Sequence, residues 1–363
     1  MRSPITELPI DIVDLWVDGN DPVWRAKRHQ AAMRMGTAEA QALPPYGNVE
    51  GRFRDKHQLC YSLRASSHMT LVSHQDLLPA DRLPTFDSGN IETYIHRIPG
   101  LSERYFYLDD DVFFGAPVQL DHWFWPGGVY AAWSDDPEVS EGPMRPGDNS
   151  QENASRLSGE WLNGLPSLES GDYQHTPRTF AHSPRPMLKS LLFQLEAEAP
   201  ELFERVRSSV FRAWDNPTLV SDFVLRWALA HGVAKIRAYA HLYVATGDID
   251  QSDQLAALVQ SDGELDFFCV NDTTDDAHGH DPRLAQVKAS LKSLFPQASL
   301  FEIPQSPSAV AAVHQCAPHI RVRPLREPEP SGHGARRSGS RTLTRCRWIL
   351  DAGRGQTSRR PEL

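Results

Sequence analysis

The sequence predicts an α/β fold in which a mixed β-sheet is flanked by helices, and three observations support this prediction. Short apolar runs rich in β-branched and aromatic residues alternate along the chain with segments of helical periodicity. The composition, 40% hydrophobic and 23% charged, is that of a globular protein. Two of the apolar runs end in aspartates, at the end of a strand where open α/β sheets bind their ligands.

The predicted strands are short apolar runs that stop at polar or turn-forming residues. The first, IDIVDLWV, breaks at Gly19 and Pro22, so that Asp18 and Asp21 follow its carboxyl end. A second strand lies in MTLVS, and a third, RYFYL, precedes three consecutive aspartates. Two further strands are predicted in KIRAYAHLYVAT and LDFFCVND.

Helices are predicted where apolar residues recur at helical spacing between capping and breaking residues. In TFDSGNIETYIHRIPG, Asp87 or Ser88 caps the start, three isoleucines share a face, and Pro99-Gly100 ends the helix. The other predicted helices lie in residues 24–43, the later part of 52–66, 187–198, 201–208, 218–231 and 282–294.

One domain is predicted from residue 8 to 304, followed by a tail from 305 to 363. Within the domain, residues 135–171 are rich in Gly, Ser, Pro, Asp and Glu without periodicity, so we expect an irregular insertion or a lid there. The tail has few apolar residues and no period, which predicts disorder. Its arginines leave open a contact with anionic lipid or with a polyanionic product.

The charge distribution argues against nucleic acid as a partner. The formal net charge is −10, although residues 320–363 hold 11 of the 37 basic residues and only 4 of the 47 acidic ones. The rest of the chain is therefore strongly acidic, so long-range charge does not attract a polyanion to it. An acidic site that handles phosphate usually needs a divalent cation between the two.

Targeting signals and cysteine usage predict a cytoplasmic protein. No apolar run approaches the roughly 18 residues that span a bilayer, and the N-terminal segment lacks the pattern of a secretory signal. The four cysteines are far apart, which disfavours a zinc ribbon or a disulfide scaffold and suits a reducing compartment. The basic tail leaves peripheral contact with the inner face of the membrane open.

Three consecutive aspartates, Asp109, Asp110 and Asp111, follow RYFYL. Adjacent carboxylates repel one another unless a partner compensates them. They could cap a turn, hold Mg²⁺ or Mn²⁺ together with Asp18, or include a nucleophile. YLDDDVF has the Asp-x-Asp-Val form of haloacid-dehalogenase-like phosphatases, with Asp109 as the nucleophile, and also resembles the Asp-x-Asp metal motif of nucleotide-sugar glycosyltransferases. For Asp18, capping of the Gly19 turn is the structural alternative.

Other polar residues are candidates for handling a phosphate. His182 in HSP could act as a general base near neutral pH, and His175 competes for that role. Arg212 either pairs with a carboxylate such as Asp215 or offers its planar guanidinium to a phosphate. The remaining candidates are the arginine pair Arg52 and Arg54 and the strand-end residues Asn271 and Asp272.

Taken in order, these segments resemble the four conserved blocks of the Stealth family of sugar-phosphate transferases. The first block is IDIVDLWVDGNDPVW, and the second combines RFRDKHQLCYSLR with LVSHQDLLPADRLPTFDSGNIETYIHRIPGLSERYFYLDDDVFFG. The third begins at AHSPRPMLKS and ends at VFRAWDN. The fourth runs from FFCVND to SLFE. The family includes bacterial capsule and exopolysaccharide phosphotransferases, and the resemblance implies a Rossmann-like, glycosyltransferase-A-like catalytic domain.

The resemblance also implies roles for individual acids. Asp18, Asp110 and Asp111 fall on acidic positions that the family requires for activity, and Asp110 and Asp111 would hold the metal. Asp109 falls on a variable position.

The same resemblance places the remaining site residues. His182 aligns with the third-block histidine, in preference to His175, and Arg212 aligns with the third-block arginine. The second of the two acids that normally follow this arginine is replaced by Asn216. The predicted substrate-binding residues are Arg52, Arg54, Asn271, His96 and Arg97.

One departure from the family pattern is large. Family members carry about 30 more residues between YSLR and LVSHQD, where this chain has only ASSHM and one threonine. The missing segment would contribute a sheet strand. Either this chain closes its sheet differently, or its activity is impaired, or its reading frame is faulty.

The function that these features imply is transfer of a sugar-1-phosphate from a nucleotide-sugar, such as a UDP-sugar, to a hydroxyl of a surface polysaccharide, with release of UMP. Mg²⁺ or Mn²⁺ would neutralise the diphosphate, and His182 would accept the proton of the acceptor. The alternatives are a metal-dependent glycosyltransferase, a dehalogenase-type phosphatase, and a non-catalytic nucleotide-sugar binder.

Overall fold

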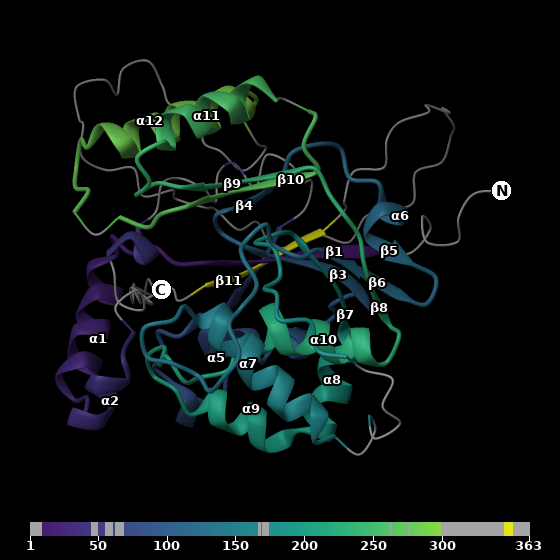
Figure 1. Cartoon of the computed structure of the whole chain (residues 1–363). Coiled ribbons are helices and arrows are strands. Elements are labelled where there is room, and N and C mark those ends of the chain that lie inside the picture. The colour runs from purple at the N-terminus through teal and green to yellow at the C-terminus, as the bar shows by residue number, and fades with distance from the viewer. Residues whose placement is uncertain are drawn as a thin grey trace, which may run out of the picture.

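A five-stranded sheet with the order β2-β11-β1-β3-β7 forms the centre of the molecule in the computed structural model (Figure 1). The structure describes residues 9–44, 50–54, 61, 69–165, 168, 174–261, 263–274, 276–298 and 345–350. The strands are β1 (Ile10–Trp16), β2 (Met69–Ser73), β3 (Arg104–Asp109), β7 (Arg185–Leu188) and β11 (Arg345–Leu350). Only β7 is antiparallel to its neighbour, so the sheet is mixed, as predicted.

Helices lie on opposite sides of the group of sheets. Figure 1 shows α5, α7, α8, α9 and α10 on one side, α11 and α12 on the other, and α1 and α2 at one edge. The central strands β1 and β3 are buried runs in which Val13 and Phe106 have no exposed surface. The helices are α1 (Pro22–Met33), α2 (Thr37–Ala42), α4 (His74–Leu77), α5 (Ser88–Glu92), α6 (Leu120–Trp123), α7 (Ser150–Asn163), α8 (Lys189–Glu198), α9 (Pro200–Arg207), α10 (Val224–Ala230), α11 (Gln251–Gln260) and α12 (Pro282–Leu294).

Two three-stranded sheets flank the central one. The first has the order β4-β10-β9 and consists of β4 (Val112–Phe114), β9 (His241–Ala245) and β10 (Phe267–Asn271). The second has the order β5-β6-β8 and consists of β5 (Phe124–Trp125), β6 (Gly128–Ala131) and β8 (Ala234–Ile236). Since β4 follows β3 directly, the three aspartates lie where the chain passes from the central sheet to the first flanking sheet.

The prediction of a wholly disordered tail is wrong for Arg345–Leu350. This segment is β11, which lies between β1 and β2 and is parallel to both. In the order of the described strands, β11 is the sole neighbour of β2 and joins it to β1. The rest of the tail lies outside the described residues.

The prediction of an irregular stretch at 135–171 is wrong for Ser150–Asn163, which form α7. Asn149 caps the helix by accepting hydrogen bonds from the backbone N–H groups of Gln151 and Glu152, and Glu152 bonds back to the Asn149 N–H. This capping box and the burial of Ala154 and Leu162 outweigh a composition that is typical of loops.

Candidate active site

The strand register gathers the polar strand ends at one edge of the central sheet, which we call the rim. β1 and β3 are parallel with Leu15 opposite Asp109, so the residues that follow both strands leave the sheet at the same edge. β7 is antiparallel to β3 with Arg185 opposite Tyr107. The residues that precede β7, including His182, therefore reach the rim from the other direction.

Asp111, His182 and Cys269 come together at the rim. β10 pairs with β4 so that Cys269 lies opposite Val112, one residue beyond Asp111. One donor atom from each of the three side chains lies within 4.8 Å of the other two, and Nδ1 of His182 is 3.7 Å from Sγ of Cys269. Burial, followed by the negative charge of Asp111, raises the pKa of the Cys269 thiol well above its usual value.

Asp109 belongs to a buried charge network beneath the rim. Its carboxylate accepts a hydrogen bond from Nη1 of Arg185 at 2.8 Å, and the Tyr107 hydroxyl lies 3.0 Å from both Asp109 Oδ1 and Glu92 Oε1. Burial raises the pKa of Asp109, but the opposing charges of Arg185 and His182 outweigh it and leave the pKa below its ordinary range. Asp109 is therefore held ionised by its partners.

Glu92 is the second acid of this network. Burial, together with the neighbouring charge of Asp109, raises its pKa to about 7. A protonated Glu92 resolves the hydrogen bonding, because the Tyr107 hydroxyl can then donate to Asp109 while it accepts from Glu92.

Arg212 and Arg52 are two neighbouring cations at the site. Nε of Arg212 is 3.5 Å from Oδ1 of Asp87, the residue that caps α5, and its Nη2 donates to the Ser88 hydroxyl. The charge of Arg212 and, secondarily, burial lower the pKa of Arg52 to about 10, against the opposing fields of Asp87 and the rim aspartates. Arg212 therefore pairs with a carboxylate, as one of its two predicted roles requires. The carboxylate is that of Asp87, whereas Asp215 pairs with Arg205.

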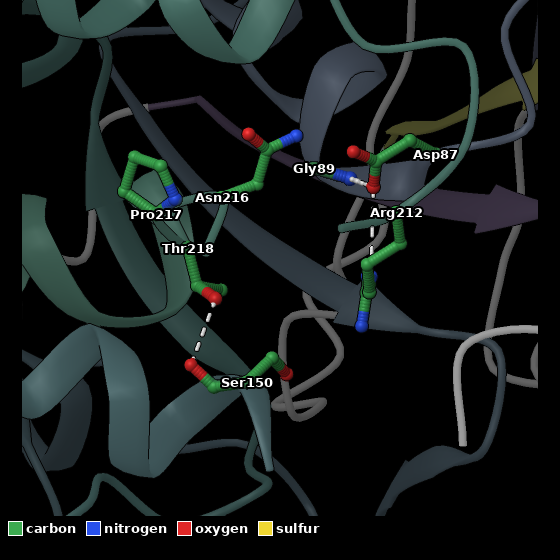
Figure 2. Close-up of a pocket in the computed structure, with 7 residues that line it drawn as sticks. All are labelled: Asp87, Gly89, Ser150, Arg212, Asn216, Pro217 and Thr218. Carbon is green, nitrogen blue, oxygen red and sulfur yellow. Dashed lines mark hydrogen bonds and ion pairs between the residues drawn. The ribbon is translucent and has the colours of Figure 1, made fainter. Parts of the chain in front are cut away.

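Figure 2 shows the Asp87–Arg212 pair at one side of a cavity, with Ser150 and Thr218 facing each other across the other side. The cavity has a volume of about 10 Å³, which is room for about one water molecule. Gly89, Asn216 and Pro217 complete its lining, so the asparagine that replaces the expected acid lines the same cavity as Arg212.

Arg54 makes structural contacts, and its predicted binding of substrate stays a prediction. Its Nη1 contacts Asp272 Oδ2 at 2.5 Å and Thr274 Oγ1 at 3.0 Å, which ties the segment of Arg52 to the end of β10. A Cβ on Gly19 would lie 1.5 Å from the Phe53 carbonyl oxygen, so only glycine lets this segment approach the turn after β1.

Asp18 accepts a hydrogen bond from the Asn20 N–H at 2.9 Å, as the turn-capping alternative requires. Asn271 donates to the Tyr243 hydroxyl at 2.8 Å, and the Tyr243 ring lies edge-on to His182 with centroids 6.0 Å apart. Asn271 thus approaches the rim, whereas the described contacts of Asp18 are local.

His96 and Arg97 contact Glu196 of α8, at 2.8 and 2.6 Å, together with Arg207. Burial lowers the pKa of His96 to about 4 despite Glu196, so the imidazole is neutral near pH 7. These contacts are those of an ion-pair network between helices, and substrate binding by either residue stays a prediction.

The donors at the rim fit a magnesium ion only in part. Mg²⁺ prefers six oxygen ligands and commonly takes one or two carboxylates plus substrate phosphates. Of the predicted pair, Asp111 belongs to the donor group of the described residues, Asp110 does not, and the other two donors are nitrogen and sulfur. Asp111 could thus bind Mg²⁺ together with phosphate oxygens, and metal binding by the Asp110–Asp111 pair stays a prediction.

Several residues of the site escaped sequence reasoning. Arg185, Tyr107 and Glu92 lie in buried segments that read as plain strand or helix, and their pairing depends on strand register. Cys269 carried a usable signal, since it lies two residues before the polar strand end at Asn271 and therefore on the same face of the strand. Asp87 was noted only as a helix cap, a role that it does have, with its side chain accepting from Gly89 N–H.

Comparison with known proteins identifies three segments of the chain. Residues 8–36, 64–131 and 258–312 match, respectively, conserved regions 1, 2 and 4 of Stealth proteins. The third expected block, at residues 181–216, lies outside these matches and stays a prediction.

Curated relatives are similar over most of this chain. The exopolysaccharide phosphotransferase CpsY of Mycobacterium tuberculosis is 31% identical over 315 residues, 79% of this chain and 57% of the relative. An exopolysaccharide phosphotransferase of Streptomyces coelicolor is 29% identical over 327 residues, 83% of this chain and 33% of the relative. One of Nocardia farcinica is 29% identical over 328 residues, 82% of this chain and 62% of the relative. The chain thus spans between a third and about three fifths of these relatives.

Within the described residues, no helix has both the length and the apolar character that crossing a bilayer requires.

Proposed function

Because the chain belongs to the Stealth protein family, we propose that it is a phosphotransferase that acts on an exopolysaccharide. The relatives described above bear the name exopolysaccharide phosphotransferase. Their names support the reaction class, and the residues at the rim support a site that handles phosphate.

The observation that supports the proposal most strongly is the pair of guanidinium groups at Arg52 and Arg212. The charge of Arg212 is the largest cause, ahead of burial, that lowers the pKa of Arg52 to about 10, so the two cations repel each other. A phosphate that enters between them would relieve this repulsion and could accept hydrogen bonds from both planar groups. The same groups would stabilise charge that develops on a phosphoryl group during transfer.

The donor in this proposal is a nucleotide-sugar such as a UDP-sugar. The acceptor hydroxyl oxygen bonds to the phosphorus that carries the sugar, the bond from that phosphorus to the UMP oxygen breaks, and UMP leaves. The acceptor proton passes to His182, whose Nδ1 faces Cys269. Such a donor would place the reaction in the cytoplasm.

The remaining roles are assigned by position. Asp111 would bind Mg²⁺ or Mn²⁺ with the donor phosphates, and the cation would neutralise their charge. Asp110 is proposed to bind this cation with Asp111, and Asp18 to act in catalysis beside them. Asn271 and Arg54 are proposed to contact the donor.

The test incubates the purified chain with Mg²⁺, a panel of UDP-sugars and an oligosaccharide acceptor, and identifies the nucleotide released. UMP is the expected product. We expect H182A and R212K to reduce kcat by about 100-fold or more, since each removes a proton-transfer or phosphoryl-binding group. R205A is the matched control, because Arg205 is exposed and pairs with Asp215.

Three results would exclude the proposal. Release of UDP would mean glycosyl transfer, and hydrolysis of a simple phosphate ester without an acceptor would mean a phosphatase. Binding of the UDP-sugar without any turnover would mean a binding protein.

A further inference from the structure

Three donors of different chemistry converge on one point of the rim, each from a different part of the chain. Asp111 comes from the turn between β3 and β4, His182 from the segment before β7, and Cys269 from the middle of β10. The turn and β10 are held together by a hydrogen bond of 2.9 Å from the Val270 N–H to the Asp111 carbonyl. The pairing of β4 with β10 thus fixes Asp111 and Cys269 beside each other, and His182 lies three residues before the start of β7.

The carboxylate in this cluster has unused bonding capacity. Asp111 is only 8% exposed, and its Oδ1 accepts no hydrogen bond from any described residue. A buried carboxylate oxygen without a partner is costly, and a cation is the partner that would compensate it best. Sγ of Cys269, which is 1% exposed, and Nδ1 of His182 complete the triangle of possible ligand atoms.

We propose that Asp111, His182 and Cys269 form a binding site for a borderline transition-metal ion of the Zn²⁺ class. Thiolate and imidazole are ligands that Zn²⁺ accepts and that Mg²⁺ avoids. Zn–N and Zn–S bonds of about 2.0 and 2.3 Å at a tetrahedral angle separate the two donors by about 3.5 Å. The distance of 3.7 Å between Nδ1 and Sγ is close to that value.

Binding is a ligand exchange without oxidation. The metal replaces the thiol proton, which leaves to solvent, and the sulfur, the imidazole nitrogen and one carboxylate oxygen each form a bond to the ion. A fourth position remains for water. The ion also bonds to the His182 nitrogen that the proposed function uses as its base. Zn²⁺ should therefore inhibit phosphotransfer, whereas Mg²⁺ supports it. This consequence rests on the proposed function.

The site itself is tested without any substrate. The full chain is titrated with Co²⁺, an ion that forms similar tetrahedral sites and gives a near-ultraviolet absorption band when it binds a thiolate. We expect this band at one Co²⁺ per chain, its loss when one equivalent of Zn²⁺ is added, and its persistence in a large excess of Mg²⁺.

Two ligand variants and one control decide the assignment. C269S and H182Q should each abolish the band or weaken Zn²⁺ binding more than about 100-fold. Loss of a residue that only hydrogen-bonds to a metal ligand typically weakens binding by about 10- to 100-fold. C316S removes another of the four thiols and should retain the band. Circular dichroism identifies a variant that has not folded, and the other variant then decides.

Absence of the band in the wild-type chain, or an equal band in folded C269S and H182Q, would overturn the proposed site. Inhibition is measured separately, with Zn²⁺ added to the Mg²⁺-supported assay. Zn²⁺ binding with unchanged turnover would refute the use of His182 as the base and leave the metal site standing.

Discussion

Asp109 offers the sharpest test of the buried charge network, through the substitution Asp109→Asn. Asparagine keeps an oxygen that can accept from Tyr107 but removes the charge that compensates Arg185. The Arg185 side chain is 2% exposed, so its guanidinium cannot recover hydration. Removing one partner of a buried ion pair typically costs about 3–5 kcal/mol. Because Asp109 is itself 23% exposed, we expect the lower end, about 3 kcal/mol.

The measurement is urea unfolding of D109N beside the wild-type chain, with D248N as a matched control on an exposed aspartate. D248N should change the free energy of unfolding by less than about 0.5 kcal/mol. Equal stability of D109N and D248N would refute the network. This cost also limits the use of D109N to separate a phosphatase from a phosphotransferase, since lost activity would then reflect lost folding as well as a lost nucleophile.

Three further predictions follow from single features. The folded pKa of Glu92, about 7, lies above the ordinary 4.5, so its contribution to stability is complete below about pH 4.5 and is lost as the pH rises through 7. That is a loss of about 3 kcal/mol that E92Q should remove from a series of unfolding curves against pH; an unchanged pH profile in E92Q would contradict the assignment. Deletion of residues 337–363 removes β11 and should lower the urea midpoint of unfolding and speed amide exchange in β1. Deletion of residues 352–363 retains β11 and should change neither. Equal behaviour of the two truncations would show that β11 does not complete the sheet. G19A places a Cβ 1.5 Å from the Phe53 carbonyl oxygen and should reduce both stability and phosphotransfer. The control G147A has no atom within 4 Å of its Cβ and should reduce neither. Equal results for the two variants would rule out the close approach at Gly19.

Local signals predicted the elements whose ends are set by residues next to them. Asp281 and Pro282 begin α12, and its predicted end at Leu294 is confirmed. Asp87 caps α5 as expected, but the helix is shorter than predicted because it ends at Glu92 and is followed by a separate turn of 3₁₀-helix. The acidic strand ends were recognisable for the same reason, since strand and turn are adjacent in sequence.

Long-range pairing could not be predicted from local signals. Helix α11 was not predicted and β11 was assigned to disorder, although both have regular structure. A short strand is stabilised mainly by the strands that pair with it. The strands that pair with β11 are about 270 to 340 residues away in the sequence. Its prediction as a strand would have required knowing that the sheet lacked one.

The sequence alone determined that this chain is an α/β protein with the conserved segments of the Stealth family and with carboxylates, a histidine and arginines for phosphate chemistry. The fold determines which of these residues come together: Asp111 with His182 and Cys269, and Asp109 with Arg185. Residue propensities and helix caps influence the backbone over only a few positions along the chain. Strand register, in contrast, joins residues 70 or more positions apart, and burial then decides which charges need one another.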